Sequence, residues 1–117
     1  MPTTEQIEDT VTRYVEAVGR QDLDATLALF AEDARQEDPV GTPANVGRDA
    51  IRGFFEKAYR ATFSTHLVGP LLVTGDHAAV HFTIELPAEP EPMVVRVIDL
   101  IRFDDDGLIA DLKAVVT

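Results

Sequence analysis

Cysteine is absent from this sequence, and basic residues are scarce. Without cysteine the chain has no disulfide, no thiol nucleophile and no cysteine-ligated zinc. Its 10 Lys and Arg stand against 21 Asp and Glu, which gives a formal net charge of -11 at pH 7. That charge repels the phosphates of nucleic acids and the anionic surface of a membrane, so we expect neither as a partner.

Long apolar runs are also missing. No run approaches the length needed to cross a membrane, and residues 1–10 lack the apolar stretch of a signal peptide, so we expect a cytoplasmic protein. The 117 residues are 45% hydrophobic and 26% charged, an ordinary composition for one globular domain. Because no repeat, linker or low-complexity tract divides the chain, a single domain over residues 1–117 is expected.

Three helices are expected in the first half of the chain. Apolar residues recur at helical spacing over residues 4–18, after a threonine that can cap the helix start. Asp22 can cap a second short helix, whose apolar stripe includes Phe30. A third helix is expected to begin near Arg48 and to carry apolar residues inward as far as Ala58.

The second half of the chain predicts strands. Alternating and β-branched segments cover residues 71–74, 78–86, 94–103 and 108–116, and Gly75-Asp76 between the first two favours a hairpin. Helices first and antiparallel strands afterwards indicate an α+β fold. We expect three helices to cover one face of a curved, mainly antiparallel sheet, which makes a cone around an apolar pocket.

Tyr14 lies on the inward stripe of the first predicted helix. It follows Val11 by three residues and precedes Val18 by four, so its ring should face the core. A packing residue whose hydroxyl donates to a backbone carbonyl would show the same pattern. Tyr14 therefore becomes a candidate for function only if other polar residues point into the same space.

Asp99 is a carboxyl group on an otherwise apolar strand face. Its face carries Val95, Val97, Ile101 and Phe103, and the opposite face carries Arg96, Ile98, Leu100 and Arg102. An unpaired buried anion is costly, so burial should keep Asp99 protonated and able to donate a hydrogen bond. A buried ion pair with an arginine, or a strand phase that exposes Asp99, remains an alternative.

Asp38 precedes a proline, which favours an extended backbone at Asp38 and places it at a strand end or loop edge. An ordinary turn-forming aspartate is the alternative interpretation. Glu37 is a weaker candidate for the same site, because adjacent residues of an extended chain point to opposite sides and Glu37 should face solvent.

Together these segments resemble the bacterial Δ5-3-ketosteroid isomerases of the NTF2-like, SnoaL-like superfamily. The resemblance rests on Tyr14 in its helix, on residues 22–34, on Glu37-Asp38-Pro39-Val40-Gly41, on residues 48–54 and on Asp99. It implies a cofactor-free isomerase acting on a steroid, in which Asp38 carries a proton from C4 to C6. It also implies that Tyr14 and protonated Asp99 donate hydrogen bonds to the C3 oxygen.

The resemblance further implies a homodimer and an apolar substrate pocket. The outer sheet face offers Val94, Ile98, Leu100 and Leu112 as contacts between two copies. By strand or helix phase, the candidate substrate-binding residues are Phe54, Phe82, Ile84, Leu86, Ile101 and Phe103. Each of them could equally be a core residue. Phe55 stands where some members of the family carry a tyrosine, and Tyr59 follows one turn later.

Other functions stay open at this point. Epoxide hydrolases of the same superfamily need an Asp-Arg-Asp set in the pocket, whereas Arg96 and Arg102 should face outward. A polyketide cyclase, or a non-catalytic protein that binds a small apolar ligand, also fits an apolar cone. A metal enzyme is disfavoured, because the histidines have no matched carboxylate spacing on one inward face.

Overall fold

The helices precede most of the strands, and the α+β class predicted from the sequence is confirmed. A computed structural model of the protein describes all 117 residues. Its elements are α1 (Thr4–Gly19), α2 (Leu23–Leu27), β1 (Phe30–Glu37), β2 (Asn45–Val46), α3 (Arg48–Ala58), β3 (Ser64–Leu67), β4 (Leu72–Thr74), β5 (His77–Leu86), β6 (Met93–Phe103) and β7 (Ile109–Val116). The strands form one sheet in the order β2-β1-β7-β6-β5-β3, with β4 paired to β5.

Local sequence signals account for the start of α1. The Thr3 hydroxyl accepts a hydrogen bond from the backbone of Gln6, and the Gln6 side chain accepts one from the backbone of Thr3. This reciprocal pair satisfies two donors that a helix start leaves free. The stripe facing inward is buried, as predicted.

The second helix is shorter than the sequence predicts, because Phe30 begins a strand instead of extending α2. Ile109 donates its backbone N–H to the carbonyl of Leu29 at 2.8 Å, and Phe30 pairs with Ile109 on β7. Pairing with a strand from the far end of the chain thus overrides the helical spacing of the local sequence.

The pair β1 and β7 is parallel, while the other pairs of the sheet are antiparallel. A parallel pair needs a long connection along the chain. Here α3 and the strands β2 to β6 lie between β1 and β7 in the sequence. The hairpin predicted at Gly75-Asp76 is confirmed as β4 and β5. The two-residue strand β2 was not predicted, because so short a segment carries no periodicity.

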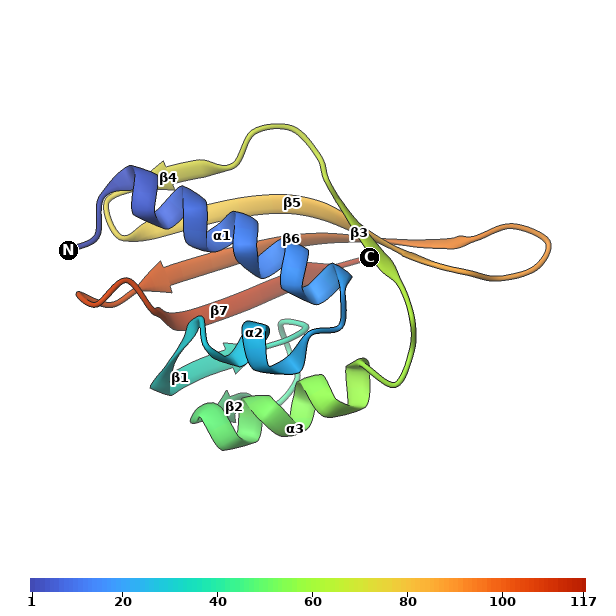
Figure 1. The fold of residues 1–117 in the computed structure, drawn as a ribbon, viewed down its shortest axis with the longest axis horizontal. Helices are drawn as coiled ribbons and strands as arrows, with labels where there is room; N and C mark the ends of the chain where they lie inside the picture. The colour runs from blue at the N-terminus through green and yellow to red at the C-terminus, as the bar shows by residue number, and fades with distance from the viewer.

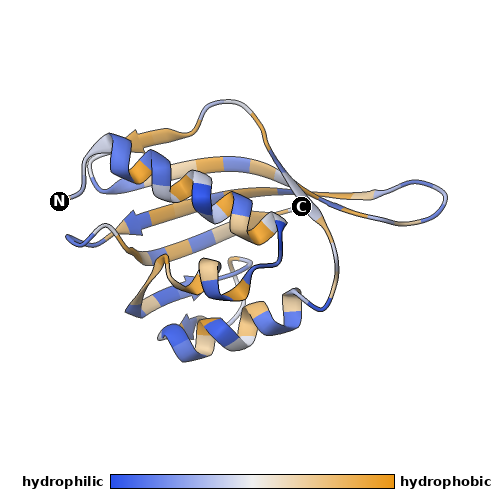
Figure 2. Ribbon diagram, in the orientation of Figure 1, coloured by the Kyte–Doolittle hydropathy of each residue, from blue (hydrophilic) through white to orange (hydrophobic).

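The helices lie on one side of the sheet (Figure 1). α1 packs against β3, β4 and β5, α3 packs against β1 and β2, and α2 contacts both of the other helices. Hydrophobic and hydrophilic bands alternate along α1 and α3 (Figure 2), as expected for helices with one buried face. The hairpin between β5 and β6 extends beyond the body of the fold, and its tip is hydrophilic (Figures 1 and 2). No helix combines the length and the apolar character that crossing a membrane requires.

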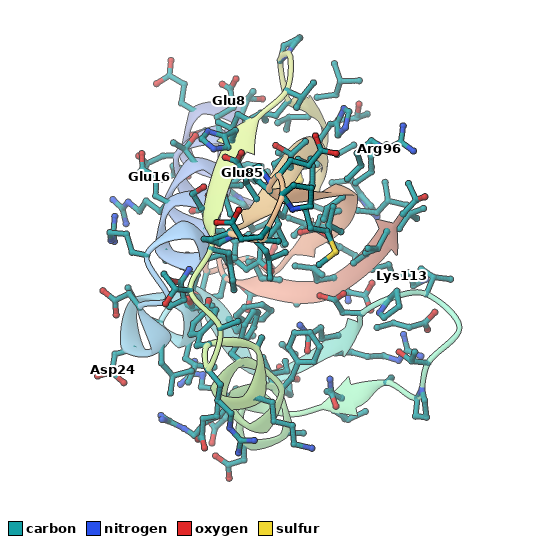
Figure 3. All side chains as sticks on the ribbon, turned by 90° about the vertical axis from the view of Figure 1, so that its right-hand side faces the viewer. Glu8, Glu16, Asp24, Glu85, Arg96 and Lys113 are labelled. Carbon is teal, nitrogen blue, oxygen red and sulfur yellow. The ribbon has the colours of Figure 1, made fainter.

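The face of the sheet turned away from the helices carries charged and apolar residues. Figure 3 shows Arg96 and Lys113 on this side and Glu8 and Asp24 on the helix side. Three of the residues predicted for this outer face, Val94, Ile98 and Leu100, are exposed. The fourth, Leu112, is fully buried, so that prediction is wrong. Leu112 pairs directly with Ile101, and paired residues share a face, so both point into the core.

Candidate active site

A cavity of about 250 Å³ lies between the helices and the sheet. Its lining comprises Tyr14, Val18, Asp38, Phe54, Phe55, Ala58, Tyr59, Ala61, Phe63, Phe82, Ile84, Leu86, Val95, Val97, Asp99 and Val116. Of these 16 residues 14 are hydrophobic, and the two exceptions are the carboxyl groups of Asp38 and Asp99. The structure therefore brings together the three polar residues singled out from the sequence, within an otherwise apolar space.

Tyr14 enters the cavity from α1 and is 2% exposed. Its ring packs edge-on against Phe30 and Phe55, with centroid distances of 5.9 and 6.4 Å. Burial, with the nearby Asp99 and Asp38 carboxyls, raises the pKa of Tyr14 well above its ordinary value. A tyrosine with only a packing role would donate a hydrogen bond to a backbone carbonyl. The Tyr14 hydroxyl forms no such bond, so it is free to donate to a ligand.

Asp99 lies in the middle of β6 and is 1% exposed, so the inward strand phase is confirmed. Its neighbours across the sheet are Val80 on β5 and Ala114 on β7, both buried. Its Oδ1 atom has no hydrogen-bond partner, and no arginine pairs with it. Burial, then the charge of Asp38, raises the pKa of Asp99 well above its ordinary value. Burial therefore favours the protonated form of this carboxyl, which can donate a hydrogen bond.

Asp38 follows the end of β1, and β7 holds it close to Asp99. Val40 donates its backbone N–H to the carbonyl of Ala114 at 2.8 Å, and Ala114 is the residue that pairs with Asp99. Burial raises the pKa of Asp38 from 3.8 to about 6. At pH 7 this carboxyl is mostly ionised, but it binds a proton far more readily than an aspartate in water.

Glu37 does not line the cavity, in agreement with the sequence interpretation. It is nevertheless not directed at solvent, because its side chain is only 18% exposed. Its carboxylate lies 3.4 Å from the guanidinium of Arg35 and accepts the backbone N–H of Gly41 at 3.2 Å. Glu37 thus stabilises the turn that follows Asp38.

Four of the six apolar residues predicted for the pocket wall line the cavity, namely Phe54, Phe82, Ile84 and Leu86. The other two, Ile101 and Phe103, do not, and they are 1% and 2% exposed within the core. The cavity ends at Asp99, which is the last β6 residue that lines it. Beyond Asp99 the inward side chains of β6 pack within the core and border no empty space. Strand phase identifies the inward face but does not say where the empty space ends.

Several lining residues were not named from the sequence as part of the wall. Val18 and Tyr59 each lie one helical turn after another lining residue, Tyr14 and Phe55, so helical spacing could have found them. Phe63 follows the end of α3 in irregular chain, where no period gives a signal. No arginine lines the cavity, and no cluster of three or more His, Asp or Glu side chains is placed to hold a metal ion.

Comparison with known proteins shows the family of this chain. A family model of the SnoaL-like domain matches residues 11–112. The chain belongs to the SnoaL-like family. It is 38% identical over 109 residues to the steroid Delta-isomerase of Nocardioides simplex, an alignment that covers 93% of this chain and 88% of that protein. It is 28% identical over 118 residues to the epoxide hydrolase LasB of Streptomyces lasalocidi, covering 97% of this chain and 42% of that protein.

Proposed function

We propose that this SnoaL-like protein is a steroid Δ-isomerase that converts 3-oxo-Δ5-steroids into 3-oxo-Δ4-steroids without a cofactor. One observation carries the proposal: a single apolar cavity brings together Asp38, Tyr14 and Asp99. Burial raises the pKa of Asp38 to about 6 and favours the protonated, hydrogen-bond-donating forms of Tyr14 and Asp99. The identity to the steroid Delta-isomerase of Nocardioides simplex over most of both chains supports it.

Asp38 is the proposed base. Its carboxylate removes a proton from C4, which leaves a dienolate, and the same proton then returns to C6 as the double bond moves into conjugation with the ketone. The steroid neither gains nor loses an atom in these two proton transfers. A pKa of about 6 suits both halves of the shuttle, because the group is ionised at neutral pH and still holds the proton long enough to deliver it.

Tyr14 and Asp99 are the proposed donors to the C3 oxygen. Negative charge grows on that oxygen as the dienolate forms, and two fixed donors in an apolar cavity stabilise it without reorganising. Burial favours the protonated, donating form of both groups, because it raises the pKa of each well above its ordinary value. Neither the Tyr14 hydroxyl nor the Asp99 Oδ1 atom has a protein partner from which a substrate would have to displace it.

The rest of the cavity fits a flat, uncharged molecule. Phe54, Phe82, Ile84 and Leu86 are the proposed contacts to the steroid rings, since all four line the cavity that holds the two carboxyl groups. An epoxide hydrolase of this superfamily would need an arginine between two acids. The absence of arginine from the lining favours the isomerase over the activity named for LasB.

We also propose that two copies associate through the outer face of the sheet. Val94, Ile98 and Leu100 are exposed there by 55%, 42% and 48% of their surface. Apolar side chains gathered on one exposed sheet face are typical of a contact surface. Sedimentation of the purified protein tests this point, and a monomer at micromolar concentration would contradict it.

The test of the isomerase is ultraviolet absorbance of the protein mixed with 5-androstene-3,17-dione. The conjugated enone of the product absorbs, whereas the substrate does not, so growth of that band reports turnover. Asp38→Asn should abolish the signal, because an amide cannot take up the proton. Asp33→Asn, an exposed aspartate on β1 outside the cavity, is the matched control and should retain it. No band above the buffer rate would overturn the proposal and turn attention to a cyclase or a binding protein.

A further inference from the structure

The geometry points to Tyr59 as a specificity-determining residue that offers the substrate a hydrogen-bond acceptor and selects steroids carrying a hydroxyl on the end remote from C3. This inference rests on the proposed function, since it assumes that a steroid occupies the cavity. Tyr59 is neither the proposed base nor one of the proposed donors to the C3 oxygen.

The direction of two hydrogen bonds fixes what Tyr59 can offer. The Thr26 hydroxyl lies 2.7 Å from the backbone carbonyl of Asp22 and 2.7 Å from the hydroxyl of Tyr59. A carbonyl can only accept, so the single hydrogen of Thr26 goes to Asp22. Tyr59 must therefore donate its own hydrogen to Thr26. The Tyr59 oxygen then has only lone pairs left, and it can accept but not donate.

This arrangement is held in place by packing. Thr26 is fully buried on α2, behind the cavity wall, and Tyr59 lines the cavity at the end of α3. The Tyr59 ring packs between Phe55 and Phe63, with centroid distances of 5.3 and 6.3 Å. Burial raises the pKa of Tyr59 to about 12, so the hydroxyl keeps its hydrogen, and with it the bond to Thr26, over the working pH range.

Tyr59 lies further along α3 than Phe55, the residue that packs on Tyr14. The C-terminal ends of α1 and α3 both point toward the β5–β6 hairpin (Figure 1), and Leu86 at the base of that hairpin lines the cavity. Tyr59 is one turn beyond Phe55, the residue that packs on Tyr14, so it is about 6 Å further along α3. A steroid with C3 at Tyr14 and Asp99 that lies along the cavity toward Leu86 would bring its D ring past Tyr59.

The two ends of the cavity therefore have opposite hydrogen-bonding character. The end at Tyr14 and Asp99 offers donors, which suit a carbonyl oxygen, and the Tyr59 end offers an acceptor, which suits a hydroxyl. A ketone oxygen facing Tyr59 would set two acceptors against each other in an apolar space and lose its hydrogen bonds to water. The site should thus favour a hydroxylated D ring over an oxidised one.

Equilibrium binding of estradiol and estrone tests the inference, because these phenolic steroids share the ring that would contact Tyr14 and differ in a D-ring hydroxyl or ketone. Isothermal titration calorimetry of the intact protein should show tighter binding of estradiol, by about tenfold, the value of roughly one hydrogen bond. Tyr59→Phe should bring the ratio of the two dissociation constants close to one.

Thr26→Val gives the sharper result. Valine keeps the volume of threonine but cannot accept the Tyr59 hydrogen, so Tyr59 becomes able to donate to the ligand and the preference should move toward estrone. The Asp22 carbonyl remains bonded to the backbone N–H of residue 26 at 3.0 Å, which protects the helix. Thr12→Val is the matched control: Thr12 donates to the backbone carbonyl of Glu8 in the same way but does not line the cavity. Its ratio should equal that of the unaltered protein.

The outcomes separate the two proposals. Equal affinity for the two steroids in the unaltered protein, or a preference that survives Tyr59→Phe, overturns the role of Tyr59 while isomerase turnover on the same preparation leaves the proposed function standing. Failure of both steroids to bind, together with absent turnover, overturns both. A preference for estradiol that disappears in Tyr59→Phe and shifts toward estrone in Thr26→Val supports the inference.

Discussion

Replacing Asp38 by asparagine should stabilise the folded protein at alkaline pH while it removes the proposed base. Burial raises the pKa of Asp38 from 3.8 to about 6, so the folded state binds this proton more tightly than the unfolded chain does. The contribution of the carboxyl to stability is therefore complete below the unfolded pKa and is lost as the pH rises through about 6. Asparagine has the shape of the protonated acid and cannot ionise, so it avoids that loss.

The magnitude follows from the two pKa values. They differ by about 2 units, and each unit corresponds to about 1.4 kcal/mol. Above about pH 8, Asp38→Asn should therefore raise the free energy of unfolding by about 3 kcal/mol, against a total of about 5–15 kcal/mol for a typical domain. Near pH 4 the two proteins should differ by less than about 1 kcal/mol, because the carboxyl is then protonated in the folded state.

Urea unfolding followed by circular dichroism, near pH 4 and near pH 8, measures this difference. Asp33→Asn is the control, since Asp33 is exposed and forms no ion pair, and its stability should stay within about 0.5 kcal/mol of the unaltered protein at both pH values. The reasoning fails if Asp38→Asn is no more stable near pH 8. It also fails if the gain is the same at both pH values, because a gain without pH dependence cannot come from ionisation.

The remaining predictions concern the donors, the pH profile and the pocket wall. Asp99→Leu should lower kcat by about 100- to 1,000-fold in the enone assay, while Asp99→Asn, which still donates, should retain more activity. Tyr14→Phe should lower kcat to a similar extent without lowering the urea midpoint, since the lost hydroxyl has no protein partner. The value of kcat/KM should rise with pH and level off above about 6, as Asp38 ionises; a profile flat down to about pH 4 would assign the base to another group. Ile84→Val should raise KM, whereas Ile101→Val should cost about 0.5–1.5 kcal/mol of stability at unchanged KM, and an effect of Ile101→Val on KM would return that residue to the pocket wall.

Local periodicity was enough to find the inward faces of this protein. The helical stripe of α1 places Tyr14 inside, and the alternation of β6 does the same for Asp99, because side-chain direction in a helix or strand is set by the backbone geometry of that element alone. The burial of both residues agrees with these predictions. The shift of pKa expected for Asp99 also follows from the sequence, since it needs only an apolar face without a cation.

The tertiary structure decided the features that depend on a partner distant in the sequence. Phe30 belongs to β1 because β7 pairs with it, and Leu112 points inward because it lies opposite Ile101. No local pattern in the sequence shows where the cavity ends along β6. Nor does any local pattern show the hydrogen bond between the hydroxyls of Tyr59 and Thr26. A period in the sequence reports which way a side chain points, but the depth of a cavity and the direction of a hydrogen bond depend on which elements meet across the core.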